Sequence, residues 1–148
     1  HEDYRCTVTL MSGLPGAGKD TWLARHKPGL PVVALDAIRE SLDVDATDNQ
    51  GEVIQAAREQ AREHLRARRN FGFNATNITR QMRQRWIDLF VDYGARIEIV
   101  YVEPPVARIL AQNKPRPSPV PENVILRLLG KLEVPVATEC HSLTIAAG

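Results

Sequence analysis

The chain has 148 residues, of which 43% are hydrophobic and 25% charged, and its formal net charge is +1. That length suits one domain with a buried core, and that balance excludes a chain kept disordered by its charge. No hydrophobic run approaches the ~20 residues of a membrane-spanning helix, so we expect no membrane partner. Cys6 and Cys140 fit no metal-binding spacing and are too few for a disulfide scaffold, which favours the cytoplasm. Because the chain starts with His1 and not methionine, we expect residues 1–148 to be a single domain excised from a larger protein.

Short hydrophobic runs alternate along the chain with longer segments of helical periodicity. The hydrophobic runs predict strands at 7–11, 31–35, 71–75, 96–102 and 143–146. Helical spacing predicts helices at 19–25, from 36 onward, and at 51–69, 79–94, 105–112 and 122–132. Prolines at every second position from 115 to 121 exclude both helix and central strand, so 114–121 is expected to be a stiff exposed loop. The alternation predicts an α/β fold, with a parallel sheet of four or five strands and helices on both faces.

Two charged stretches and one hydrophobic stripe predict which faces of these helices are exposed and which are buried. Eight arginines stand against two glutamates between Arg58 and Arg85, whereas six acids stand against one arginine between Asp36 and Glu52. The arginines could meet nucleic-acid phosphates or form solvated helix faces, and for Arg80 and Arg83 we favour solvent. The helix at 79–94 is expected to bury the stripe Met82, Trp86, Leu89, Phe90 and Tyr93.

The segment GLPGAGKDT, at 13–21, lies directly between the first predicted strand and the first predicted helix. Its glycines allow a tight turn that aims backbone N–H groups inward, and the start of the helix adds its positive dipole end. Lys19 supplies a mobile charge that can follow the terminal phosphates of a nucleotide. The predicted nucleotide-binding residues are Gly13, Leu14, Pro15, Gly16, Ala17, Gly18, Lys19, Asp20, Thr21 and Trp22.

The residue after the loop lysine departs from the usual pattern. A Ser or Thr hydroxyl normally meets Mg²⁺ there, whereas this chain has Asp20 followed by Thr21. Thr21 could supply the hydroxyl one position later, or Asp20 could hold the metal through water or cap the helix. The sequence therefore predicts Mg²⁺ at Thr21 or Asp20, and we favour Thr21.

A carboxylate and an arginine follow the second predicted strand. Asp36 is expected at the same sheet edge as the glycine segment, because parallel sheets gather their ligands beyond the carboxyl ends of the strands. Arg39 falls one helical turn later on the same face. Such a carboxylate can orient and deprotonate a hydroxyl, while the arginine can hold an anionic group of the same acceptor. The alternative is an N-terminal aspartate in a surface ion pair.

Four motifs together, GLPGAGKDTW, LDAIR, NATN and NKPRPSPVP, resemble the kinase domain of bacteriophage-type and bacterial polynucleotide 5′-kinases. The order and spacing cover the chain from Thr7 to about Leu132. The resemblance implies a P-loop kinase fold with a Pro-rich lid, ATP or another nucleoside triphosphate as donor, and Mg²⁺. It implies that Asp36 is the general base, that Arg39 contacts the phosphate next to the terminal nucleoside, and that Arg116 in the lid reaches over the donor phosphates.

The resemblance is incomplete at two positions. Gln112 stands where many members have a second lid arginine, and Asn74 stands where relatives often have an aspartate near the metal. With Asn74 there, the metal would depend more on Thr21, Asp20 and Asp36. Asn77 is either part of this motif or a turn residue that bonds its own backbone.

The residues, together with this resemblance, imply a kinase whose catalytic set is Lys19, Asp36, Arg39 and Arg116; the resemblance implies that it acts on 5′-hydroxyl ends of RNA or DNA in nucleic-acid repair. Related kinase domains are fused to phosphatase or ligase modules, so fused repair domains are expected outside this chain. Two alternatives stay open, namely a kinase of a small molecule such as a sugar, nucleoside or antibiotic, and a nucleotide-binding module without catalysis.

Overall fold

A computed structural model describes residues 3–45, 49–103 and 120–146. The strands are β1 (Cys6–Ser12), β2 (Val32–Ala34), β3 (Phe71–Asn74), β4 (Ala95–Val102) and β5 (Ser142–Ala146). The helices are α1 (Lys19–His26), α2 (Leu35–Leu42), α3 (Gly51–Arg66), α4 (Arg80–Asp92) and α6 (Glu122–Lys131), with a 3₁₀ turn at Ala137–Glu139. All five predicted strands are confirmed to within two residues at their ends. The predicted helix at 105–112, Gln112, Arg116 and most of the predicted loop at 114–121 lie outside the described residues.

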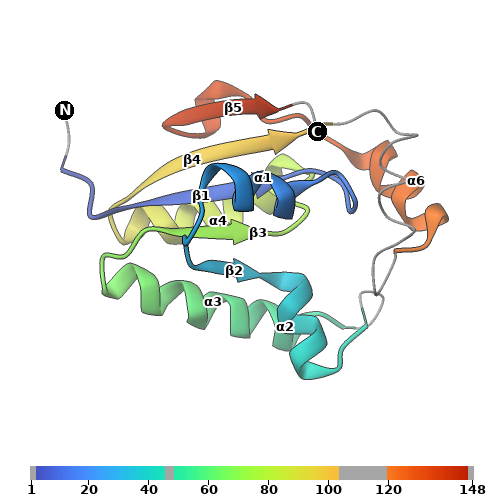
Figure 1. Cartoon of the computed structure of the whole chain (residues 1–148), viewed down its shortest axis with the longest axis horizontal. Helices are drawn as coiled ribbons and strands as arrows, with labels where there is room; N and C mark the ends of the chain where they lie inside the picture. Colours follow the sequence, from blue (N-terminus) through green and yellow to red (C-terminus); the bar gives the residue numbers. More distant parts are fainter. Residues whose placement is uncertain (1–2, 46–48, 104–119, 147–148) are drawn as a thin grey trace.

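The strands form one sheet in the order β2-β3-β1-β4-β5, and every neighbouring pair is parallel (Figure 1). β1 lies at the centre, where Met11 is in register with Asn74 of β3 and Ser12 with Tyr101 of β4. Because all the strands run the same way, the segments that follow β1, β2 and β3 leave the sheet at the same edge. The predicted parallel α/β fold is therefore confirmed.

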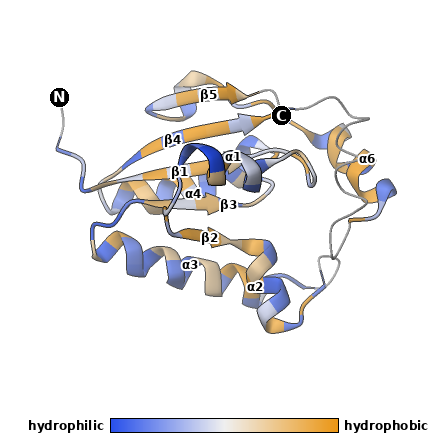
Figure 2. Ribbon diagram, viewed as in Figure 1, coloured by the Kyte–Doolittle hydropathy of each residue, from blue (hydrophilic) through white to orange (hydrophobic). Residues whose placement is uncertain are grey.

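The two faces of the sheet are covered by different helices (Figure 1). Alternate residues of β1 separate the faces, since Val8 and Leu10 belong to one hydrophobic cluster and Met11 to another. The larger cluster joins β1, β3 and β4 to the buried residues of α3 and α4, whereas the smaller one joins β1 and β4 to Leu23 of α1. Figure 2 accordingly shows strands that are largely hydrophobic and an α1 that is largely hydrophilic.

The buried stripe of α4 differs from the predicted one. It consists of Arg83, Trp86, Ile87 and Phe90, whereas Met82 is 39% exposed. The helix is rotated by about one residue from the expected orientation, because Arg83 finds hydrogen-bond partners inside the protein. The prediction that Arg83 is solvated is therefore wrong. Thr79 caps this helix, as predicted, and its Oγ1 accepts a hydrogen bond of 3.1 Å from the Met82 amide.

The C-terminal third of the chain packs beside the glycine segment. A third hydrophobic cluster joins Ile125 of α6 to Leu14 of the glycine segment and to Ile78, and each of the three is at least 96% buried. The amide of Glu133 donates a hydrogen bond of 2.7 Å to the carbonyl of Ile78. The residues after α6 are thus attached to the turn that follows β3. Within the described ranges, no helix has the length and hydrophobicity needed to cross a bilayer.

Candidate functional site

The glycine segment forms a closed loop from the end of β1 to the start of α1. Gly13 has a φ of 153°, and a Cβ added there would come within 2.7 Å of the Val102 carbonyl oxygen, so only glycine fits. Gly16 and Gly18 have φ values of 81° and 102°, a backbone region that glycine enters without strain. The amide of Ala17 donates to the Leu14 carbonyl at 3.0 Å, which closes the turn. The loop has the conformation that a phosphate-binding nest requires.

The loop collects positive charge at the start of α1. The Lys19 Nζ donates hydrogen bonds of 2.7 Å to the Gly13 carbonyl and 3.1 Å to the Leu14 carbonyl, which hold the ammonium over the loop. Gly18 is the N-cap residue, and no side chain among the described residues caps this terminus. The first N–H groups of a helix lack partners within the helix and carry its positive dipole end. These groups attract an anion to this point.

The residues that could hold a metal come together beside the loop. The Nδ2 of Asn74, at the end of β3, donates a short hydrogen bond to Oδ1 of Asp20, and Thr21 is exposed next to it. Carboxylate, hydroxyl and amide oxygens are the ligands that Mg²⁺ prefers. In the described part of the chain, no three His, Cys, Asp or Glu side chains gather into a metal-binding group. Mg²⁺ is usually bound through one or two carboxylates together with substrate phosphates, and the oxygens of Asp20 and Thr21 fit that mode of binding.

Trp22, also predicted to bind nucleotide, has a packing contact on α1. Its ring stacks on His26, with ring centroids 4.5 Å apart and an interplanar angle of 17°. It also packs against the hydrophobic cluster of Met11 and Leu23. The stack lies within α1, whereas the contact with the Met11 cluster joins α1 to the sheet.

Asp36 and Arg39 lie together on α2, as their spacing predicted. Arg39 Nη1 donates to Asp36 Oδ1 at 2.7 Å, and Arg39 Nε donates to Gln50 Oε1 at 2.6 Å. Gln50 in turn donates to the Asp45 carbonyl at 2.9 Å, so the guanidinium is oriented from two sides. The Asp36 side chain is 70% exposed and that of Arg39 is 23% exposed. A carboxylate with this exposure can be reached by a substrate hydroxyl.

The sheet sets the distance between the two halves of the site. Asp36 follows β2 and the glycine loop follows β1, with β3 between them. Two strand spacings amount to about 10 Å. Asn74 and Asp20 lie across this interval, because Asn74 ends β3 and contacts Asp20. The loop and the carboxylate therefore lie at the same edge of the sheet, on either side of the Asn74–Asp20 contact.

A buried polar network behind the loop was not predicted. Asn77 has a φ of 47°, and its Nδ2 donates to the Met11 carbonyl at 2.8 Å, so this side chain does not bond its own backbone, which was one of the two alternatives. The Asn77 carbonyl accepts from Ser12 Oγ at 2.8 Å and from Arg83 Nη1 at 2.9 Å. The helical stripe 83, 86, 87, 90 could have placed Arg83 inside. No sequence pattern pairs it with Glu139, which lies 56 residues away.

Burial and hydrogen bonding shift several pKa values near this network. Burial alone would raise the pKa of Glu139, but hydrogen bonds from Arg83 and the Val136 amide, with the charges of Arg83 and Arg80, lower it below its usual range. Burial, with the nearby Glu103 carboxylate, raises the pKa of Tyr101 to about 12. Glu139 is therefore ionised and Tyr101 neutral at neutral pH.

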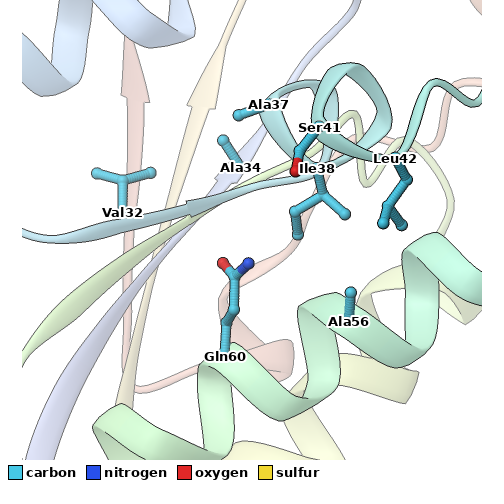
Figure 3. A pocket seen from close by; sticks show the side chains of 8 residues that line it. All are labelled: Val32, Ala34, Ala37, Ile38, Ser41, Leu42, Ala56 and Gln60. Carbon is cyan, nitrogen blue, oxygen red and sulfur yellow. The ribbon is translucent and has the colours of Figure 1, made fainter.

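Two hollows of the described surface lie away from the glycine loop. One, of about 200 Å³, lies between β2, α2 and α3, where Ile38, Leu42 and Ala56 approach one another and Gln60 reaches toward the strand (Figure 3). A second, of about 380 Å³, is lined by residues around Asp43 and Glu52. The lining of the first contains no charged side chain. It therefore does not suit a phosphate.

A glycine loop between the central strand of a parallel sheet and its first helix defines the P-loop kinase fold. The chain belongs to the AAA domain family, whose profile matches residues 8–135. That match spans most of the sheet and every predicted site residue.

Solved structures support the same fold. A provisionally assigned kinase from Chloroflexus aurantiacus J-10-fl superposes with a TM-score of 0.73 at 14% identity, covering 97% of this chain and 88% of its own. A sugar kinase from Janibacter sp. HTCC2649 gives 0.68 at 18% identity, covering 96% and 85%. A chain of the Pnkp1/Rnl/Hen1 complex gives 0.67 at 18% identity, covering 82% of this chain and 43% of that one. At such identities the likeness is one of fold.

Proposed function

We propose that this chain transfers the γ-phosphate of ATP, or of another nucleoside triphosphate, to the 5′-hydroxyl end of RNA or DNA. The observation that carries the proposal is a reachable carboxylate, Asp36, which follows β2 at the same sheet edge as the glycine loop, with only β3 between β2 and β1. The choice of a polynucleotide rests on the four-motif resemblance. In that case the domain serves nucleic-acid repair in the cytoplasm, next to repair domains outside residues 1–148.

The donor side binds and polarises the triphosphate. Backbone N–H groups of the loop and of the first turn of α1 surround the β- and γ-phosphates, and Lys19 neutralises their charge. Asp20 and Thr21 would hold Mg²⁺, which when bound neutralises charge on the β- and γ-phosphates. Arg116, which lies outside the described residues, is assigned the clamp over the moving group.

The acceptor side supplies the base. The hydroxyl oxygen attacks the γ-phosphorus while the bond to the β–γ bridging oxygen breaks, so that the nucleoside diphosphate leaves with that electron pair. Asp36 accepts the hydroxyl proton. Arg39, held by Asp36 and Gln50, binds the phosphate next to the terminal nucleoside.

One observation favours a second candidate, a small acceptor. The stretch from Asp36 to Glu52 contains six acids and one arginine, and a long polyanion would be repelled there. The arginines between Arg58 and Arg85 are partly engaged elsewhere, since Arg83 is buried and Arg62 pairs with Glu59. A sugar or nucleoside with a single anionic group would meet Arg39 with much less of this repulsion.

Label transfer from γ-labelled ATP tests both candidates. We expect transfer to RNA and DNA oligonucleotides with a 5′-hydroxyl, none to the matched 5′-phosphorylated oligonucleotides, and a KM that falls as the oligonucleotide lengthens. Equal transfer to a nucleoside and an oligonucleotide would support the small acceptor. Tight ATP binding without transfer to any hydroxyl would leave a nucleotide-binding module and overturn the proposal.

A further inference from the structure

A buried ion pair lies behind the glycine loop, outside the residues assigned to either substrate. The Arg83 side chain is 0% exposed and that of Glu139 is 1% exposed. Arg83 Nε donates to Glu139 Oε1 at 2.8 Å and Nη2 donates to Oε2 at 3.2 Å, which is the two-pronged geometry of a strong pair. Hydrophobic residues of similar volume usually stabilise a core at least as well. Stability alone is therefore a weak explanation for the pair.

The remaining donor of Arg83 leads to the glycine loop. Nη1 donates to the Asn77 carbonyl at 2.9 Å, and the same oxygen accepts the Ser12 hydroxyl at 2.8 Å. Asn77 Nδ2 donates to the Met11 carbonyl at 2.8 Å, and the amide of Gly13 donates to the Thr76 carbonyl at 2.9 Å. Three consecutive residues at the entrance of the loop are thus hydrogen-bonded to the turn that carries the Arg83 contact.

The other end of the pair comes from the C-terminal segment. Glu139 Oε2 accepts a hydrogen bond of 3.0 Å from the Val136 amide, which fixes the carboxylate in its own turn. The same segment bonds the Asn77 turn twice more, from the Glu133 amide to the Ile78 carbonyl at 2.7 Å and from the Arg80 amide to Glu133 Oε1 at 3.0 Å. The turn after β3 is therefore held between the C-terminal segment and the end of β1.

We propose that Arg83 and Glu139 are positioning residues for the nucleotide-binding loop. The pair fixes the Asn77 carbonyl, which accepts the hydrogen bond from the Ser12 hydroxyl. Asn77 has a left-handed backbone conformation, and its side chain holds the end of β1 at the Met11 carbonyl. The loop amides then keep the orientation that phosphate requires before the nucleotide arrives. The loop therefore loses less conformational entropy when the nucleotide binds. This inference rests on the proposed nucleotide binding at residues 13–19.

The test replaces both charges together, because a lone buried charge can prevent folding. The double variant Arg83→Met/Glu139→Leu keeps the volume and removes the pair, and Asn77→Gly keeps the positive φ but removes the bond to Met11. Leu65→Ala, in the hydrophobic cluster of α3, is the control that destabilises the protein away from the loop. Thermal unfolding and circular dichroism identify the folded variants. Fluorescent ATP-analogue titration then gives the Kd of each at a temperature where it is folded.

We expect the double variant and Asn77→Gly to bind the ATP analogue at least tenfold more weakly, while Leu65→Ala stays within twofold of the wild type. The KM for ATP should rise in the double variant and in Asn77→Gly but not in Leu65→Ala, and the KM for the acceptor should stay unchanged in all three. Wild-type affinity in the double variant, or an equal loss in Leu65→Ala, would overturn the positioning role. If the wild type itself does not bind the analogue, the proposed function fails instead.

Discussion

The two halves of the site are built in opposite ways. The donor side is rigid, because its glycine loop is attached to buried groups, with Ser12 and Asn77 bonded at 2.8 Å and Leu14 packed under α6. The acceptor side is open, because Asp36 is 70% exposed on the first turn of α2. In the proposed function, the fold then determines the donor, whereas acceptor choice depends on a few exposed side chains that can change without affecting the core.

The donor half is most sharply probed at Lys19. We expect Lys19→Met to lower kcat by roughly 10²–10³-fold, since one preorganised charged donor near the transferred group is removed. Steady-state label transfer measures the effect, and Lys27→Met, at the far end of α1, is the matched control. A loss of less than tenfold would mean that the loop does not bind the reacting phosphates.

The acceptor half is probed at Arg39. Truncation to alanine removes charged hydrogen bonds, each contributing about 1.5–3 kcal/mol, so the acceptor KM should rise roughly 10–100-fold. The nucleotide Kd should not change, because Arg39 lies two strands from the loop. Arg62→Ala, on α3, is the control. Should KM for ATP rise instead, the assignment of the two halves would be wrong.

Variants of Asp20 and Asn74, which lie between the two halves, test whether Mg²⁺ binds at these residues. Asp20→Asn should weaken the apparent Mg²⁺ affinity at fixed ATP by roughly 10-fold or more, the range seen when groups around a metal are altered. Asn74→Asp, which adds a second carboxylate beside Asp20, should strengthen it. A larger effect of Thr21→Val than of Asp20→Asn would identify the hydroxyl as the principal ligand.

The smallest expected effect concerns stability against pH. The folded pKa of Glu139 is lowered, so its contribution is complete above the unfolded pKa of about 4.3 and is lost as pH falls through the lower folded pKa. Acid unfolding of the double variant Arg83→Met/Glu139→Leu, which leaves no unpaired buried charge, should therefore be less steep than that of the wild type in this range. Denaturant titrations at several pH values measure the free energy of unfolding of each protein. The same dependence on pH in both proteins would contradict the lowered pKa of Glu139.

The sequence could predict the parallel sheet, the glycine loop and the Asp36–Arg39 pair because each depends on neighbouring residues. A hydrophobic run specifies a strand, and a three-residue step specifies one helix face. It could not predict the Arg83–Glu139 pair, since no local pattern records a contact across 56 residues. Met82 was placed inside because hydrophobicity alone ranks it above arginine, whereas the partners available to Arg83 decide the rotation of α4.

Transfer of the γ-phosphate to a 5′-hydroxyl RNA by the wild type and by Asp36→Asn, at saturating ATP, is the most direct test. The Asn variant keeps the size of the side chain and cannot accept the hydroxyl proton. We predict that it binds nucleotide with an unchanged Kd and transfers phosphate roughly 10²–10⁴-fold more slowly. Transfer at the wild-type rate by Asp36→Asn would contradict the assignment of this carboxylate as the base.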